Sequence, residues 1–315
     1  MSFITRAAAR ISRASTEISA RSALPEAAWF DSDAALDQIA SRSGGDRGDH
    51  ETLTSWVRNG YAVVEGVVPH GLIDAMLDDL DGAFTATQPL PGLEFCDLEF
   101  DTDGHRSTVD HGQLLARPEE QRLAARERSN WRVHAFVEQS NAADAVRRHP
   151  ELQRVASMIL GIPSEAGYSI NFHNGSRQDL HQDSCVFHLG VPNLIVGAWV
   201  ACEDIIEGAG PLVYYPGSHR GPLFSEFDDY PNTNLRTAPD DGTAARYTAQ
   251  IVGDSDGFEE HKFLARKGDV LFWHGMLIHG GAAITEPGTT RKSLVLHFVP
   301  PGADAAQRVT LPARW

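Results

Sequence analysis

The chain has 315 residues, of which 42% are hydrophobic and 22% are charged, so it is long enough to form a large domain with a substantial core. Its formal net charge is −16, because 43 acidic residues outnumber 27 basic ones. This balance argues against a protein that binds nucleic acid, whose surface has to be basic, and favours one that acts on a small molecule.

The three cysteines, Cys96, Cys185 and Cys202, are too few and too scattered for a disulfide framework, and none of them forms a Cys-x-x-Cys zinc pair. The sequence contains no run of about 18 apolar residues, so no membrane-spanning helix is expected. These features predict a cytoplasmic protein.

Residues 1–50 are predicted to form an N-terminal extension that ends in a linker at residues 41–50, which are rich in Ser, Gly and Asp. The first 24 residues place arginines among Ala, Ser and Ile, a composition typical of a presequence or of a helix on a membrane surface. The apolar face of this segment is mostly alanine, so we favour the plainer interpretation, a helix that is frayed or packs on the protein surface.

Residues 51–305 are predicted to form one domain, which is followed by a C-terminal tail at residues 306–315. Its first part is mainly helical, because apolar residues recur at helical spacing. The predicted elements are a helix at 53–58, a strand at 61–64, a helix from Pro69, an irregular region at 85–115, a polar helix or loop at 119–128, and a helix at 142–160 that restarts at Pro150.

The second part of the domain is rich in short β-prone runs that are separated by Gly and Pro. These runs lie at residues 168–173, 180–189, 195–202, 212–215, 269–273 and 293–299. They predict an all-β core with flanking helices (α+β), most naturally a double-stranded β-helix, the cupin-like jelly roll. A long polar and acidic insertion at residues 222–265 interrupts the strands and is a candidate lid.

The strand predicted at residues 180–189 contains the tripeptide His181-Gln182-Asp183. Residues two apart on a strand share a face, so His181 and Asp183 would aim an imidazole and a carboxylate at one point. With a second histidine they would make the 2-His-1-carboxylate set, which holds Fe(II) and leaves positions open for a chelating cosubstrate and O2. The tripeptide alone is common by chance, so the interpretation depends on the residues downstream of it.

The second histidine is expected on a late strand, where His274 and His279 are the candidates. They are an odd number of residues apart and would face opposite ways on a regular strand, so only one of them can readily be the ligand. Arg291 lies further along the chain, and its guanidinium offers two parallel donors that suit one carboxylate of a dicarboxylic cosubstrate.

Several motifs occur in a fixed order, at residues 60–64, 181–183, 198–204, 210–212, 216–219 and 268–280, followed by Arg291. In this order they resemble the phytanoyl-CoA dioxygenase family of Fe(II)- and 2-oxoglutarate-dependent oxygenases, over about residues 55–301. The resemblance implies an enzyme that uses Fe(II), 2-oxoglutarate and O2, hydroxylates a C–H bond of its substrate, and releases succinate and CO2.

Carried over residue by residue, the resemblance implies that His181, Asp183 and His279 are the catalytic iron ligands, that Arg291 pairs with the C5 carboxylate of 2-oxoglutarate, and that Trp199 flanks this cosubstrate. Halogenating relatives carry a small residue where this chain has Asp183. Hydroxylation is therefore the expected outcome, although desaturation and ring chemistry remain open.

One position departs from the family pattern. Many members carry a serine two residues after the last ligand, where its hydroxyl contacts 2-oxoglutarate, and this chain has Gly281 there. Thr289, Thr290 and Asn171 are the candidates for a replacement donor.

Other polar residues near these motifs have plainer interpretations. His274 is expected to pack or to make a hydrogen bond behind the site, and His219 to fix its turn rather than to line a pocket. A zinc site made of His181, Cys185 and His188 is disfavoured because their spacings do not share one face of a strand. Cys185 is expected to be a small buried hydrophobe.

Candidate substrate-contacting residues are the polar His134, His173 and Arg177 and the apolar Phe187 and Trp273. The sequence has no run of basic residues for the phosphates of coenzyme A, so a specialised metabolite or small polar metabolite is favoured over an acyl-CoA or lipid. Two competing classes are a non-catalytic jelly-roll protein that keeps the metal site to bind a ligand, and a Zn(II) enzyme without 2-oxoglutarate. Neither needs an arginine anchor for a dicarboxylate.

Overall fold

A computed structural model of the chain describes residues 24–175, 178–187, 191, 193–227, 229–230 and 233–301. The arginine-rich N-terminal segment, apart from its last residue, and the C-terminal tail lie outside these residues. In the part of the chain that is described, no helix is both long and apolar enough to cross a membrane.

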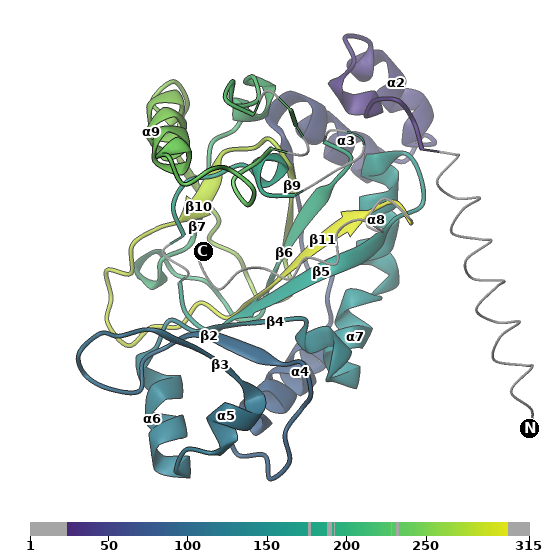
Figure 1. The fold of residues 1–315 in the computed structure, drawn as a ribbon. Coiled ribbons are helices and arrows are strands. Elements are labelled where there is room, and N and C mark those ends of the chain that lie inside the picture. Colours follow the sequence, from purple (N-terminus) through teal and green to yellow (C-terminus); the bar gives the residue numbers. More distant parts are fainter. Residues whose placement is uncertain are drawn as a thin grey trace, which may run out of the picture.

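Two antiparallel sheets form the centre of the fold (Figure 1). The larger sheet has eight strands in the order β1 (Tyr61–Val64), β9 (Val270–His274), β6 (Val196–Ala201), β11 (Ser293–Val299), β5 (Glu165–Phe172), β4 (Arg132–His134), β2 (Glu94–Leu98) and β3 (Ser107–Asp110). The smaller sheet has the order β10 (His279–Gly281), β7 (Leu212–Tyr214) and β8 (His261–Lys262). This is the jelly roll with flanking helices that the sequence predicts.

The central strands are buried on both faces, which explains why their sequences are apolar at almost every position. Successive side chains of a strand point to opposite faces. On β11, Leu294 and Leu296 join a cluster that includes the helices, whereas Val295 joins a second cluster with Leu212 and Tyr214 of the smaller sheet. The second cluster is therefore the core between the two sheets.

Helices cover the outer face of the larger sheet. They contribute apolar side chains to one buried cluster with the outward side chains of β6, β9 and β11. These helices are α2 (Ala35–Arg42), α3 (Arg47–Asn59), α4 (His70–Gly82), α7 (Asn141–Arg147) and α8 (Pro150–Leu160). The break between α7 and α8 confirms the predicted restart at Pro150.

Two predictions in the first half of the chain were wrong. Residues 47–50, predicted as linker, form the first turn of α3, where the side chain of Asp46 accepts a hydrogen bond from the backbone N–H of Asp49. Residues 85–115, predicted as irregular, contain β2, β3 and α5 (His111–Leu115). These strands are short and lie at the edge of the sheet, beside α5 and α6 (Glu119–Arg128), so their apolar pattern is weak (Figure 1).

A third correction concerns residues 180–189, which were predicted as a strand. Of the residues described there, only His181 forms a β-bridge, and the chain then turns into the 3-10 helix η3 (Asp183–Cys185). The predicted insertion at 222–265 contains α9 (Thr243–Ser255) and β8. Aromatic residues of this insertion pack against Cys185 and Ile278 in a separate buried cluster, so the insertion forms one wall beside the bridge.

Candidate metal centre and its cavity

Three predicted ligands converge in the structure. One side-chain donor atom from each of His181, Asp183 and His279 lies within 4.8 Å of the others. The two histidines form a cross-strand pair, because each backbone N–H donates to the other residue's carbonyl, at 2.9 and 3.1 Å. Asp183 reaches the same point because η3 turns the chain there, and not through the alternation of a regular strand.

Backbone carbonyls hold both imidazoles in one orientation. Nδ1 of His181 donates to the carbonyl of Asp179 at 2.8 Å, and Nδ1 of His279 donates to the carbonyl of Leu277 at 2.9 Å. Each ring therefore presents the lone pair of Nε2, which is how metal-binding histidines are usually oriented. Burial, and then the neighbouring His181, lower the pKa of His279 to about 4, so its ring is neutral at pH 7.

The two oxygens of Asp183 have different surroundings. Oδ1 lies 3.8 Å from Nε2 of both ligand histidines. Oδ2 accepts hydrogen bonds from Nε1 of Trp273 at 2.7 Å and from Nε2 of His297 at 2.9 Å. Burial by itself raises the pKa of Asp183, but the imidazoles of His297 and His279 outweigh it and hold this pKa well below its usual range. The carboxylate is therefore ionised and presents one oxygen to the two rings.

The donor set fits a transition-metal ion. Ligand atoms that each lie about 2.1 Å from one ion are separated by roughly 3.0–3.4 Å at octahedral and tetrahedral angles. The 3.8 Å separations are a few tenths of an ångström wider than this. Two neutral imidazoles and one carboxylate on one side of an ion are the facial set of non-haem Fe(II) oxygenases. Within the described residues, this is the one cluster of three such ligands.

His297 is a functional residue that sequence reasoning missed. It lies on β11, its side chain is almost fully buried, and its Nδ1 has no hydrogen-bond partner among the residues that the structure describes. The available signal was an imidazole in the otherwise apolar strand Ser293–Val299. Trp273, predicted as an apolar substrate wall, lines the cavity but also donates to Asp183.

A cavity of about 890 Å³ contains the metal ligands, Arg291 and Trp199. Arg291 is only 1% exposed, its Nη1 donates to the carbonyl of Gly210 at 3.1 Å, and its Nε has no partner. Burial lowers the pKa of Arg291 to about 10, which leaves it charged at pH 7. No carboxylate among the described residues lies within ion-pair distance of it. A buried unpaired charge is costly, so this guanidinium fits a site for an anionic ligand.

The candidates for a replacement hydroxyl or amide donor lie elsewhere. Asn171 faces the helices, where its Nδ2 lies 3.6 Å from the sulfur of Met76, and Thr290 donates to Oε1 of Glu203 at 2.7 Å. Thr289 donates to the backbone carbonyl of Glu286. None of the three candidates lines the cavity.

Of the candidate substrate residues, His134, Phe187 and Trp273 line the cavity. Nδ1 of His134 lies 2.6 Å from the hydroxyl of Tyr168, and burial, followed by the charge of Arg132, lowers the pKa of His134 to about 4. The neutral imidazole therefore shares a hydrogen bond with the tyrosine hydroxyl. His173 does not line the cavity but stacks on a tryptophan ring at 5.1 Å. Arg177 lies outside the described residues.

The residues with plainer interpretations lie behind the site. The ring of His274 contacts Asp31 and lies outside the metal cluster, and His219 packs against His274 with ring centroids 5.2 Å apart. Cys185 is fully buried, and burial raises the pKa of its thiol to about 12. His188, the remaining member of the disfavoured zinc set, lies outside the described residues.

Fold and site together define the class of protein, a jelly-roll protein with a His-Asp-His cluster and a buried arginine in the same cavity. Residues 56–293 match the family model of phytanoyl-CoA dioxygenase (PhyH), and the chain belongs to this family.

Sequence relatives support this membership over part of their length. The peroxisomal phytanoyl-CoA dioxygenase of Rattus norvegicus is 34% identical over 149 residues, which cover 47% of this chain and 40% of the rat protein. The protein of the same name from Homo sapiens is 33% identical over 153 residues, with the same coverage. The match thus spans less than half of the length of these relatives.

Solved structures share the fold at low sequence identity. The non-haem α-ketoglutarate-dependent carbocyclase SnoK from nogalamycin biosynthesis has a TM-score of 0.57 and 16% identity, covering 84% of this chain and 91% of SnoK. EctD from S. alaskensis with bound Fe has a TM-score of 0.54 and 16% identity, covering 82% of this chain and 78% of EctD. At this identity the likeness shows the architecture.

Proposed function

We propose that this protein is an Fe(II)- and 2-oxoglutarate-dependent dioxygenase that hydroxylates an unactivated C–H bond of a small or medium-sized organic substrate and releases succinate and CO2. The observation that carries the proposal is the buried Arg291, which has no carboxylate partner among the described residues and lies in the same cavity as His181, Asp183 and His279. A metal site for hydrolysis or simple binding needs no such cation. Family membership supports the same reaction class.

The proposed roles follow from the contacts. His181, Asp183 and His279 hold Fe(II), and Arg291 binds the distal carboxylate of 2-oxoglutarate beside Trp199. When bound, the iron and the keto acid supply the O2-dependent oxidation of the C–H bond. The protein fixes the geometry in which this happens, since the hydrogen bonds to Oδ2 of Asp183 leave only Oδ1 for the metal.

The walls of the cavity support an amphipathic substrate without a large net charge. The lining includes the apolar Val186, Phe187 and Leu235 as well as polar side chains from β2, β3 and β4. The arginines that line the cavity here each pair with a carboxylate: Arg106 with Glu99, Arg132 with Asp97 and Arg147 with Asp144. We therefore infer a specialised or small polar metabolite rather than an acyl-CoA, whose phosphates need unpaired cations.

Succinate release tests the proposal. The protein is reconstituted with Fe(II) in the absence of oxygen and then exposed to air with ascorbate and 2-oxoglutarate. We expect slow succinate formation without substrate, faster formation with a substrate, and a product heavier by one oxygen in mass spectra of a metabolite panel. His181→Ala is the inactive control. Absence of succinate with every compound, in protein that has bound Fe(II), would favour a non-catalytic binding protein.

A further inference from the structure

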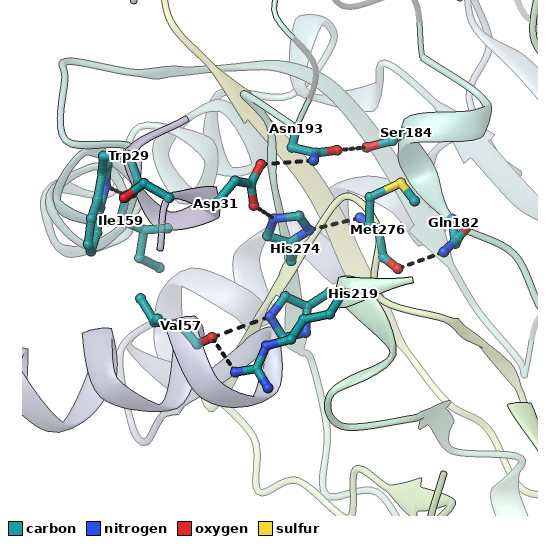
Figure 2. Close-up of polar contacts among 12 residues, drawn as sticks. Trp29, Asp31, Val57, Ile159, Gln182, Ser184, Asn193, His219, His274 and Met276 are labelled. Carbon is teal, nitrogen blue, oxygen red and sulfur yellow. Dashed lines mark hydrogen bonds and ion pairs between the residues drawn. The ribbon is translucent and has the colours of Figure 1, made fainter. Parts of the chain in front are cut away.

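Asp31 connects the N-terminal part of the chain to the back of the metal centre (Figure 2). It ends the 3-10 helix η1 (Trp29–Asp31), and its carboxylate accepts two hydrogen bonds. Nε2 of His274 donates to Oδ1 at 3.1 Å, and Nδ2 of Asn193 donates to Oδ2 at 2.9 Å. Both donors belong to loops or strands that are far from Asp31 in the sequence.

Each of these donors leads to a neighbour of the ligand Asp183. Nδ1 of His274 accepts from the backbone N–H of Met276 at 3.0 Å, and the carbonyl of Met276 accepts from Nε2 of Gln182 at 2.9 Å. On the other side, Oδ1 of Asn193 accepts from the hydroxyl of Ser184 at 2.9 Å. Gln182 and Ser184 directly precede and follow Asp183, so both flanks of the ligand are linked to Asp31 (Figure 2).

The loop that carries Asp183 packs tightly against the turn after His274. The backbone N–H of Ser184 donates to the carbonyl of Gly275 at 2.8 Å. A Cβ atom at Gly275 would lie 2.5 Å from the hydroxyl oxygen of Ser184 and 2.7 Å from the side chain of Ile195. Because no space remains between the two segments, a shift of the turn has to shift the ligand loop as well.

The segment that carries Asp31 is itself held firmly. The indole Nε1 of Trp29 donates to the carbonyl of Ile159 at 2.7 Å, and the guanidinium of Arg42 lies 4.1 Å from the Trp29 ring. Phe30 is buried, and its ring packs edge-on against Trp56 and His274. Asp31 therefore acts from a fixed position.

Asn193 has a backbone conformation that needs support. Its φ is 62°, in the left-handed region that residues other than glycine seldom adopt. Such a conformation persists where surrounding contacts determine it, and the side chain of Asn193 contacts both Asp31 and Ser184. The strain is located at the junction between η1 and the ligand loop.

We propose that Asp31 is a positioning residue of the metal centre, which acts through His274 and Asn193 on the loop 182–184 and thereby orients Asp183. The proposal rests on the proposed function for the identity of the metal. Asp31 lies before the segment that matches the family model, residues 56–293, so this role does not follow from family membership. The positioning role of Asp31 is tested by metal affinity, which is measured without catalytic turnover.

Mn(II) binding tests the proposal in the full-length protein without 2-oxoglutarate. Asp31→Asn removes the charge and one acceptor, and we expect it to weaken Mn(II) binding by about tenfold, the lower end of the effects of outer hydrogen-bond partners. Asp33→Asn is the matched control, since Asp33 is exposed in the next turn, and its affinity should equal that of the wild type. Circular dichroism and thermal melting verify that each variant is folded.

Ser184→Ala is an independent test of the proposal. It removes the hydrogen bond from the Ser184 hydroxyl to Asn193 and leaves the packing of η1 intact. If the proposal holds, Ser184→Ala weakens Mn(II) binding by a smaller factor than Asp31→Asn, because the route through His274 remains, and the double variant is less than additive. An unchanged Mn(II) affinity in folded Asp31→Asn would overturn the proposal. A wild-type protein that binds no Mn(II) and no Fe(II) would instead overturn the proposed function.

Discussion

Buried arginines usually face a carboxylate, and Arg291 faces none within the described residues. Its buried charge lies 5.8 Å from the ring centroid of Phe172 and 5.7 Å from that of Trp199, and these weak contacts do not replace an anion. A ligand carboxylate relieves the cost of this buried charge. The binding energy of the cosubstrate and the stability of the protein without it are thus linked through one side chain.

Arg291→Gln separates these two effects. Loss of a charge-assisted hydrogen-bonded pair costs roughly 1.5–3 kcal/mol, so the 2-oxoglutarate concentration for half-maximal succinate formation should rise by about 10–100-fold. Without cosubstrate, the same variant should melt at the same temperature as the wild type or higher, because a buried charge has been removed. A lower melting temperature together with an unchanged 2-oxoglutarate requirement would contradict the assignment.

The hydrogen bonds to Oδ2 of Asp183 give a second prediction at the residue scale. Trp273→Phe and His297→Gln differ in what they retain, since glutamine keeps an N–H donor near the position of Nε2 and phenylalanine keeps none. We expect Trp273→Phe to weaken Fe(II) binding by about 10–100-fold and His297→Gln to weaken it less. Anaerobic Fe(II) titration measures the affinity of each variant. If both variants bind Fe(II) as tightly as the wild type, these contacts do not position Asp183.

At the scale of elements, β6 and β9 pack closely against each other at the point where Trp273 donates its hydrogen bond to Asp183. Gly197 on β6 lies opposite Trp273 on β9, and a Cβ atom at Gly197 would lie 2.1 Å from the indole. Only glycine lets the tryptophan ring lie flat enough on the neighbouring strand to reach Asp183.

Gly197→Ala should therefore displace the indole, lower the melting temperature and weaken metal binding. Gly71→Ala is a matched control in α4, where a Cβ meets nothing within 4 Å. It should leave metal binding unchanged and raise the free energy of unfolding by up to about 1 kcal/mol, because alanine is the better helix former. Isothermal metal titration and urea denaturation of the two variants make the comparison, and a Gly197→Ala protein with wild-type metal affinity would refute the displacement.

The same elements show what the sequence could predict. The ordered motifs predicted the jelly roll, because strands such as β6 and β11 have strong local patterns, and they singled out three residues that the structure brings together, His181, Asp183 and His279. The turn into η3 was missed, since it depends on pairing between His181 and His279. The contacts of Asp183 with Trp273 and His297 join residues 90 and 114 positions apart, and no local pattern encodes such contacts.

At the scale of the whole molecule, buried neutral histidines couple stability to pH. Burial, with the charge of Arg132 second, lowers the pKa of His134 from 6.5 to about 4, and burial, with His274 second, lowers that of His219 to about 3. Between these values and 6.5 the unfolded chain binds more protons than the folded one. The stability that these neutral histidines contribute is therefore fully present above about pH 6.5, and it is lost as the pH falls towards 4.

For a histidine with a folded pKa of about 4, the loss between pH 7.5 and pH 5 is on the order of 2 kcal/mol. Urea denaturation of the metal-free protein at the two pH values measures it, and His134→Gln should show a smaller difference than the wild type. A free energy of unfolding that does not change between pH 7.5 and pH 5 would contradict the neutral state of these rings.

The shared backbone hydrogen bonds of His181 and His279 have a consequence for how the protein acquires its metal. These two predicted ligands come from distant parts of the chain and are joined by this backbone pairing. Closing such a long loop is among the slow steps of folding, and no short fragment carries the full set of donors. We therefore expect tight metal binding only after His181 and His279 have paired, because only then do the three side chains lie together.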